Sequence, residues 1–583
     1  MARVSAARPS SAPTGPKLKA RLNCGVGVSL ASNRKGSVVD THFASIWEAL
    51  ADTVGDQEAV VQQGIRHTWL EHEQRSARLA GFLSDAGIGR DSKVAMYLFN
   101  SPEYLETHFA ALKLRAVPVN VNYRYLDSEL AYLLENSDSE AVVYHSSLAA
   151  QVDKVRDRLP LVKAWIEVRD DDQRADGSHA YDEILAAATP APRINRSADD
   201  LALFYTGGTT GLPKGVMGAV GGGVLAGLGG LAPLLGLPPQ TPADMPATAA
   251  KLASQGRLPR SMVPCPLMHG TGMGIGCTPT KLFGGCIVLT NGRRFDPVEV
   301  WDTVEREAVT MITVVGDAFS RPMVRVLDDD RAAGKTRKLE SMRVIASSGA
   351  MFSREMKDAL VAHIPQLMIL DIIAATEGSM GQSVHSKDSP TQTASFKVGT
   401  TTQVFDELDQ LVLPGSGVIG MVALSDGVPL GYYKDPEKSA RTFRTIRDVR
   451  WSFPGDYATV EIDGTISLLG RGSQVINTAG EKVFAEEVEE TLKTHPAVDD
   501  CLVVGLADER FGQSVTAVVS LVQGTSLNPD ELSVQLILHA KASLASYKAP
   551  KRVVIVAAVP RAANGKADYA TTRSLAEGAM LST

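Results

Sequence analysis

Apolar residues recur along the chain in two alternating patterns. From Thr41 to Val121, short runs of apolar residues alternate with longer stretches in which apolar residues have helical spacing. Such runs are typical of buried strands, and their alternation with helices of about 10–15 residues predicts βαβ units around a largely parallel sheet. Here we expect helices over 43–50, 71–86 and 101–115, and strands over 59–61, 67–70, 93–99 and 116–121.

The alternation returns after Leu201, and the pattern then changes twice. Apolar runs of the parallel-strand type cover 311–315, 343–347 and 367–370. From Val404, short strands separated by Gly, Pro and Asp turns predict an antiparallel, β-barrel-like subdomain. After Gly470 a small α+β unit is expected, with helices over 485–495 and 529–544 and strands over 500–504, 515–522 and 552–556.

These patterns and the length of the chain predict an α/β protein of more than one domain. A single hydrophobic core stops growing at about 250–300 residues, and this chain has 583. We expect a basic disordered tail over 1–40, a large N-terminal domain over 41–470 and a small C-terminal domain over 471–583. The tail is expected because residues 1–35 carry Lys and Arg but no acid.

Composition excludes several classes of protein. Hydrophobic residues make up 44% and charged residues 21%, the balance of a soluble globular chain. The net charge of −7, from 59 basic and 66 acidic residues, argues against bulk binding to nucleic acid. The five cysteines have no C-x-x-C or zinc-like spacing, so we expect no disulfide framework and a reducing, cytoplasmic location.

One uncharged segment is long enough to raise the question of a membrane span. Residues 216–239 carry no charge, which meets the length rule for a membrane span. Eight glycines and Pro233 within the segment favour a buried, closely packed helix instead. We therefore expect no integral membrane span, and we leave peripheral membrane contact and assembly into a homo-oligomer open.

The segment 205–216 reads Y-T-G-G-T-T-G-L-P-K-G-V and carries the most specific chemistry in the chain. We expect a strand over 201–205 that leads into a loop. Glycines let backbone N–H groups approach an anion, threonine hydroxyls add donors, and Lys214 adds charge, so the loop suits a polyphosphate. It is not a Walker A loop, because Pro213 precedes the lysine and Gly215 follows it. A flexible Gly/Thr linker is the alternative interpretation.

This loop closely resembles the signature loop of the adenylate-forming superfamily, which includes acyl-CoA synthetases, luciferases and peptide-synthetase adenylation domains. Further segments resemble motifs of that superfamily in the same order, over most of the folded chain. They are P-L-M-H-G at 266–270, D-I-I-A-A-T-E-G at 371–378, G-Y-Y-K-D-P-E-K at 431–438, G-D at 455–456, the hinge region at 470–489 and P-R-A-A-N-G-K at 560–566. The finer likeness is to long-chain fatty-acid and steroid side-chain acyl-CoA ligases.

The resemblance implies an ATP-dependent acyl-CoA ligase. In such an enzyme the N-terminal domain, here 41–470, would bind ATP and the acyl group, and the small domain over 471–583 would be a mobile lid with the catalytic lysine. Such an enzyme activates a hydrophobic carboxylic acid as an acyl adenylate and then forms the CoA thioester, with release of AMP and pyrophosphate. ATP, Mg²⁺ and CoA are thereby implied. A stand-alone adenylation enzyme that loads a carrier-protein thiol is one alternative. A catalytically silent nucleotide-binding protein is an alternative of another class.

The resemblance also implies a role for each site residue. Contacts to the β- and γ-phosphates are implied for Thr206, Gly207, Gly208, Thr209, Thr210, Gly211 and Lys214. Thr376 is implied to contact the α-phosphate, Glu377 to bind Mg²⁺, Asp456 to hold the ribose, and Arg471 to help on the ribose or phosphate side.

The implied catalytic group is Thr206, Glu377, His269 beside the acyl pocket, and Lys566 near the C-terminus. An ammonium group at the last position would offset the charge that grows on the α-phosphate in the transition state.

The sequence departs from the superfamily pattern at the adenine site and at the hinge. Ile373 stands where an aromatic residue normally stacks on adenine, and Ala374 replaces the following glycine, so how adenine is held stays open. Ser473 occupies the usual hinge aspartate position.

Small residues follow His269, in the segment that the resemblance places beside the acyl pocket. Three glycines, Gly272, Gly274 and Gly276, follow His269 and suggest room for a bulky or long acid. Close helix packing explains them equally well.

Overall fold

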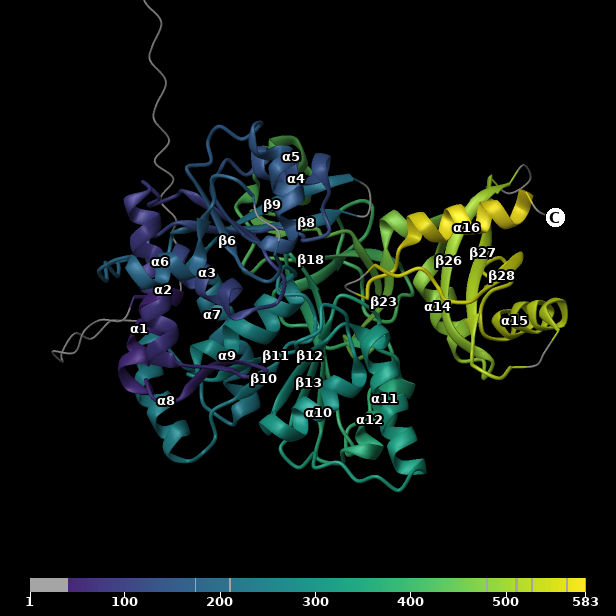
Figure 1. Ribbon diagram of the computed structural model, residues 1–583. Coiled ribbons are helices and arrows are strands. Elements are labelled where there is room, and N and C mark those ends of the chain that lie inside the picture. The colour runs from purple at the N-terminus through teal and green to yellow at the C-terminus, as the bar shows by residue number, and fades with distance from the viewer. Residues whose placement is uncertain are drawn as a thin grey trace, which may run out of the picture. The chain divides into compact units, whose positions relative to one another are not determined.

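The computed structural model describes residues 40–172, 175–208, 211–478, 481–508, 512–525, 528–562 and 565–581 (Figure 1). The predicted basic tail over 1–40 lies outside these residues except for Asp40. The domain boundaries expected from the sequence stay predictions.

The largest sheet has the strand order β15-β14-β13-β12-β10-β11-β1-β2. Its inner strands pair in parallel, whereas the outer strands β2 and β15 are antiparallel to their neighbours. The strands are β1 (Glu58–Gln62), β2 (Ile65–Thr68), β10 (Arg260–Met262), β11 (Cys286–Leu289), β12 (Met311–Val314), β13 (Val344–Ser348), β14 (Met368–Ala375) and β15 (Gly378–His385). Helices α10 (Pro297–Glu307), α11 (Gly316–Ala332) and α12 (Arg354–His363) connect the strands from β11 to β14.

A second, wholly parallel sheet has the order β4-β3-β5-β6-β7. Its strands are β3 (Lys93–Tyr97), β4 (Val117–Asn120), β5 (Ser139–His145), β6 (Ala164–Val168) and β7 (His179–Ala180). The helices before and beside it are α1 (Phe43–Thr53), α2 (Trp69–Asp85), α3 (Pro102–Lys113), α4 (Asp127–Asn136), α5 (Ala149–Arg156) and α6 (Tyr181–Ala187). Helix α3 contacts both β1 and β3, so one apolar core joins the two sheets.

The predicted phosphate loop is mostly a β-hairpin. Strands β8 (Leu201–Gly208) and β9 (Gly211–Ala219) pair with each other, and β9 also pairs with β19 (Gly431–Tyr432). The expected loop was wrong because Leu203 and Tyr205 pack into the core beside β4, which carries the strand pairing forward to Gly208.

The uncharged segment 216–239 is not one long helix. It contains the end of β9 and then the helix α7 (Val220–Leu231), which buries one face and leaves Leu225 58% exposed. Helices α8 (Met245–Ser254) and α9 (Thr278–Leu282) follow, the second after a π-helix at Thr271–Cys277. Within the described residues, no helix is both long and apolar enough to cross a bilayer.

The next part is antiparallel, as predicted. Its strands are β16 (Ser395–Phe396), β17 (Thr402–Phe405), β18 (Gly420–Leu424), β20 (Phe443–Ile446), β21 (Val449–Ser452), β22 (Asp456–Val460) and β23 (Ile466–Arg471). The helix α13 (Pro436–Thr442) lies between β19 and β20 in the chain.

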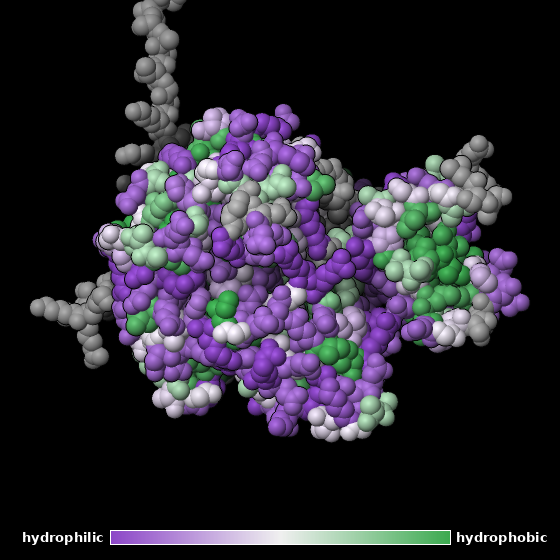
Figure 2. All heavy atoms as spheres, viewed as in Figure 1, coloured by the Kyte–Doolittle hydropathy of each residue, from purple (hydrophilic) through white to green (hydrophobic). Residues whose placement is uncertain are grey.

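The small α+β unit has its own sheet and core. Strands β24 (Val475–Thr478), β25 (Glu481–Phe484), β26 (Val498–Asp508), β27 (Gly512–Leu521) and β28 (Arg552–Val556) accompany helices α14 (Ala485–Lys493), α15 (Pro529–Ser543) and α16 (Tyr569–Leu581). Figure 2 shows apolar side chains gathered on the face of this unit that carries β26 to β28. The predicted fold class, α/β with parallel sheets, an antiparallel subdomain and a small α+β unit, is confirmed.

Candidate functional site

The hairpin of β8 and β9 places Thr206 beside Lys214. The two residues are cross-strand partners two positions from the tip, where Gly208 pairs with Gly211. A methyl group on Gly215 would lie 2.8 Å from Leu203 and 3.0 Å from the Tyr205 ring, so only glycine fits below these side chains. Thr209 and Thr210 at the tip lie outside the described residues. The backbone thus brings Thr206, Gly207, Gly208, Gly211 and Lys214 together at one end of the hairpin.

Asn120, at the end of β4, ties the hairpin to the segment that holds His269. Its Nδ2 donates to the carbonyls of Tyr205 and Met268, each at 2.7 Å, and Tyr205 N–H donates to Asn120 Oδ1 at 2.8 Å. The side chain is buried and uses both of its polar atoms. Sequence reasoning missed this residue, and the only signal for it was a polar residue at the end of an apolar strand.

Glu377 lies in the turn between β14 and β15, close to β19. The Tyr432 hydroxyl donates to Glu377 Oε1 at 2.5 Å, and the Ser452 hydroxyl donates to its backbone carbonyl at 3.3 Å. Gly378 has φ +140°, and a methyl group there would lie 2.5 Å from Leu424, which fixes the turn. Because β19 pairs with β9, Glu377 and its neighbour Thr376 belong to the surroundings of the hairpin.

The two residues at the expected adenine position differ in their packing. Ile373 is buried and packs in the antiparallel core with Met380, Phe396 and Leu424, whereas Ala374 is half-buried. The side chain of Ile373 therefore contributes to that core, and contact with adenine stays a prediction for both residues.

Asp456 begins β22 and pairs in register with Arg471 at the end of β23. Its side chain is buried, and the preceding Gly455 has φ +99°, a conformation that favours glycine. Asp456, predicted to hold the ribose, and Arg471, predicted on the ribose or phosphate side, are thus neighbours across one strand pair.

Lys566 lies against the end of β13. Its Cε is 3.1 Å from the point where a methyl group on Gly349 would be, and Thr271 Oγ1 is 3.4 Å from the same point. The turn before Lys566 packs on α11, where a methyl group on Gly565 would lie 2.9 Å from both Ala318 and Phe319.

Arg561 holds this turn in place. Its guanidinium donates to both carboxylate oxygens of Asp500, at 2.6 and 2.7 Å, and to the Gly565 carbonyl at 3.1 Å. Bidentate pairs of this kind fix geometry as well as charge. Sequence reasoning noted the motif but missed this role.

His269 is electrostatically coupled to Lys566. Burial, the ammonium of Lys566 and the guanidinium of Arg124 together lower the pKa of His269 to about 3. Its imidazole is therefore neutral at neutral pH. Close packing accounts for two of the three glycines that follow His269. Methyl groups on Gly272 and Gly276 would collide with Pro266 and Val263, whereas Gly274 faces open space.

Comparison with known proteins decides the family. The model of a family described as AMP-binding enzyme matches residues 47–433, and that of the AMP-binding enzyme C-terminal domain matches residues 487–566. The chain belongs to the AMP-binding enzyme family. The resemblance inferred from the motifs is thereby confirmed.

Curated relatives of this AMP-binding enzyme cover nearly all of the chain. The 3-oxocholest-4-en-26-oate–CoA ligase of Rhodococcus rhodochrous is 38% identical over 542 residues, which are 91% of this chain and 94% of the relative. A medium/long-chain-fatty-acid–CoA/3-oxocholest-4-en-26-oate–CoA ligase of Mycolicibacterium smegmatis is 37% identical and covers 92% of this chain and 96% of its own. The crystal structure of the anthranilate CoA ligase AuaEII in complex with anthranoyl-AMP shares the fold, with a TM-score of 0.79, 21% identity and coverage of 93% and 98% of the two chains.

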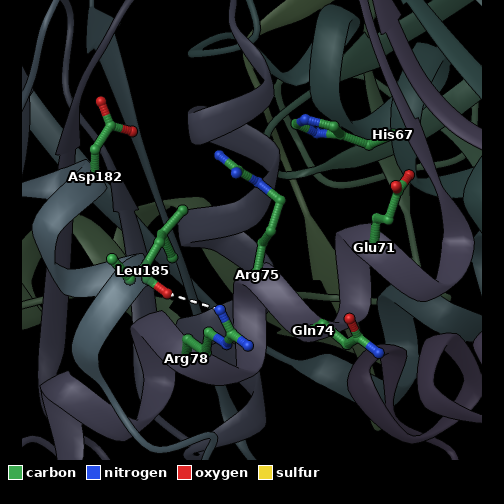
Figure 3. Close-up of a pocket in the computed structure, with 8 residues that line it drawn as sticks. His67, Glu71, Gln74, Arg75, Arg78, Asp182 and Leu185 are labelled. Carbon is green, nitrogen blue, oxygen red and sulfur yellow. Dashed lines mark hydrogen bonds between the residues drawn. The ribbon is translucent and has the colours of Figure 1, made fainter.

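A cavity of about 410 Å³ lies apart from these residues, between α2 and α6 (Figure 3). It is lined by His67, Glu71, Gln74, Arg75, Arg78, Asp182, Leu185 and Ala186. Arg75 is already paired with the buried Glu106 at 2.7 Å, and Arg78 donates to the Leu185 carbonyl. None of the residues expected at the nucleotide site lines this cavity, so it carries no part of the chemistry below.

Proposed function

We propose that this AMP-binding enzyme is an ATP-dependent acyl-CoA ligase for hydrophobic carboxylic acids. The observation that carries the proposal is the position of Lys566, which lies beside Gly349 and Thr271 and whose positive charge helps to lower the pKa of the buried His269. Asn120 links the His269 segment to the hairpin with Lys214, and Lys566 lies beside Thr271 of the same segment. The CoA ligases named above, at 37–38% identity, support the same activity.

In the first half-reaction, a carboxylate oxygen attacks the α-phosphorus of ATP, and pyrophosphate leaves with the electron pair of the broken P–O bond. The hairpin supplies backbone N–H groups and the Lys214 ammonium for the β- and γ-phosphates, and Thr376 contacts the α-phosphate. Lys566 offsets the charge that grows between the two anions. Asp456 accepts from the ribose hydroxyls, which an ionised carboxylate does well because it only accepts.

Mg²⁺ fits the residues beside the hairpin. Mg²⁺ in nucleotide sites is usually held by one or two carboxylates together with phosphate oxygens and water. Glu377 offers one half-buried carboxylate, oriented by Tyr432, and no cluster of three potential ligands occurs in the described part of the chain. Glu377 would hold the ion, whose charge would screen the phosphates during attack.

In the second half-reaction, the sulfur of CoA attacks the acyl carbonyl carbon, and AMP leaves with the electron pair of the C–O bond. The thiol proton is lost to solvent or to a base. Because His269 is neutral, it presents no positive charge to the acyl group. Medium- or long-chain fatty acids and a steroid side-chain acid are the first substrates to examine, since the names of the relatives include them.

The test is pyrophosphate release by the purified full-length protein with a panel of acids, with and without CoA. Decanoate, palmitate, 3-oxocholest-4-en-26-oate and benzoate sample chain length, ring system and aromatic character. We expect acid-dependent pyrophosphate release, with acyl-CoA and AMP as products only when CoA is present. A phosphopantetheinylated carrier protein that is acylated in place of CoA would reassign the acceptor. A folded protein that releases no pyrophosphate with any acid would refute the proposal.

A further inference from the structure

Lys438 has a second lysine, Lys214, among its charged neighbours. Its side chain is half-buried in α13, and Nζ lies 4.8 Å from the centroid of the Tyr432 ring. Among the described residues, no carboxylate forms an ion pair with Lys438, whereas Lys214 Nζ lies 3.7 Å from Asp435 Oδ2. Burial and the adjacent ammonium of Lys214 lower the pKa of Lys438 to about 8, against the opposing charges of Glu377 and Asp435. Two like charges held together cost free energy, which an anion bound between them would offset.

The backbone fixes this pair of lysines beside the hairpin. Tyr432 pairs with Val216 of β9, two residues after Lys214. The Ser439 hydroxyl accepts from Tyr432 N–H at 2.8 Å and donates to the Asp435 carbonyl at 2.6 Å, which holds the start of α13 against β19. The strand β9 with Lys214 and the helix α13 with Lys438 are thus each hydrogen-bonded to β19.

The same contacts lead to Glu377. The Tyr432 ring lies under Lys438, and its hydroxyl donates to Glu377 at 2.5 Å. An anion that contacts both lysines would therefore lie next to the carboxylate assigned to Mg²⁺ and next to Thr206, the cross-strand partner of Lys214. The β- and γ-phosphates of ATP are an anion of the right charge and extent.

We propose that Lys438 is a second lysine contact for the pyrophosphate portion of ATP, which it shares with Lys214. The proposal rests on the proposed function and extends it to a residue outside the hairpin. When the bond between the α-phosphorus and the bridging oxygen breaks, the electron pair moves to the β-phosphate, and the two ammonium groups stabilise the leaving pyrophosphate. The alternative is that Lys438 only packs on the Tyr432 ring through a cation–π contact.

Equilibrium binding separates these two roles. We would measure the binding of ATP, inorganic pyrophosphate and AMP, each with Mg²⁺, to the wild type and to Lys438→Gln by titration calorimetry. Loss of a charged hydrogen bond should weaken ATP and pyrophosphate about tenfold or more. AMP lacks the β- and γ-phosphates, so its affinity should not change. Lys438→Arg should restore part of the lost ATP affinity.

The matched control is Lys434→Gln in the same segment, because Lys434 is exposed and pairs with Asp138 at 2.8 Å. It should bind all three ligands like the wild type. Equal losses of ATP and AMP in Lys438→Gln would show a structural role and overturn the proposal, and so would an unchanged ATP affinity.

The outcome for Lys438 remains distinguishable from the outcome for the proposed function. A wild type that binds ATP but adenylates no acid would refute the ligase activity, while the comparison of ATP with AMP would still decide the role of Lys438. A wild type that binds neither ATP nor pyrophosphate would overturn both. If the enzyme is active, thioester formation from preformed acyl adenylate and CoA should be equal in Lys438→Gln and wild type, since no pyrophosphate takes part.

Discussion

Lys566 and Lys281 carry the same ammonium group in opposite surroundings. Lys566 is exposed and lies beside the segment that holds His269, whereas Lys281 is fully buried in α9. Lys281 Nζ lies 2.8 Å from His72 Nε2 and 3.9 Å from the centroid of a Trp47 ring. Each position leads to a different prediction.

Replacing Lys566 with alanine should stop adenylation but spare thioester formation. The ammonium is placed to offset charge in the first half-reaction only, and loss of one such group slows the affected step by about a hundredfold or more. Acyl-AMP formation from ATP and acid, and acyl-CoA formation from synthetic acyl-AMP and CoA, are measured separately. Equal losses in both assays would contradict the assignment of Lys566.

Lys281 should make stability depend on pH. Burial lowers the pKa of Lys281 to about 7, despite the opposing influence of Cys277 and Glu106. Between about pH 7 and the normal lysine pKa of about 10.4, the unfolded chain then binds more protons than the folded protein. The contribution of Lys281 to stability therefore rises with pH in this window, by at most about 1.4 kcal/mol per pH unit.

Lys281→Met removes this dependence. The difference between the unfolding midpoints of wild type and variant, measured in urea at pH 7, 8 and 9, should shift in favour of the wild type as pH rises. Lys154→Met, at an exposed lysine that pairs with Asp127, should show no such shift. A difference that stays constant with pH would contradict a depressed pKa for Lys281.

At the scale of elements, the best-predicted parts are those whose signals are local. Strand β28 has the predicted bounds, and α2 begins two residues before the predicted helix, after a capping box formed by Thr68 and Glu71. The hairpin was predicted as a loop because its Gly and Thr residues are typical of loops. The partners that make it a sheet, Tyr432 of β19 and the core beside β4, lie far away in the sequence.

In the candidate site, too, residues with a local sequence signal were predicted and residues that depend on distant partners were not. Motif positions such as Thr206 and Lys214 could be found from the sequence, because their spacing is specific. Asn120 and Arg561 could not, since their roles depend on partners that only folding brings near, at Met268 and Asp500. Ile373 was found from its motif position, but its packing was not predicted. Its place in the antiparallel core is set by strands that follow it in the chain.

Gly349, which follows β13, offers a test of how closely Lys566 must be positioned. It has φ +91°, and a methyl group there would lie 3.1 Å from Lys566 Cε. Gly349→Ala should therefore strain the backbone by roughly 1–3 kcal/mol. Displacing the lysine should also slow adenylation by about tenfold to a hundredfold, and the thioester half-reaction should be unaffected.

Gly334→Ala separates strain from displacement. Gly334 has φ +70°, and its surroundings are open, so alanine there carries a similar backbone cost away from the site. Both variants should lower the melting temperature, but only Gly349→Ala should slow acyl-AMP formation. If both variants adenylate at the same rate, Lys566 does not need the space above Gly349.

At the scale of the whole molecule, one arrangement of the small α+β unit should serve adenylation but not thioester formation. The resemblance to adenylate-forming enzymes implies that this unit rotates between the two half-reactions. In the described arrangement, Lys566 lies beside Gly349, and Arg325 of α11 forms an ion pair with Asp499 of β26. An enzyme held in this arrangement should complete the first half-reaction and then stop.

A covalent bridge between α11 and β26 tests this expectation. Arg325→Cys and Asp499→Cys, combined with Cys24→Ser, place two accessible thiols across the ion pair, because the other four cysteines are buried. Joining the new thiols with a short bismaleimide should leave acyl-AMP formation intact but abolish most thioester formation from acyl-AMP and CoA. The same variant with each thiol capped by N-ethylmaleimide is the control, and it should complete both half-reactions. A bridged enzyme that forms acyl-CoA as fast as the capped enzyme would show that the small unit need not move, and both half-reactions would then have to share the arrangement in which Lys566 lies at Gly349.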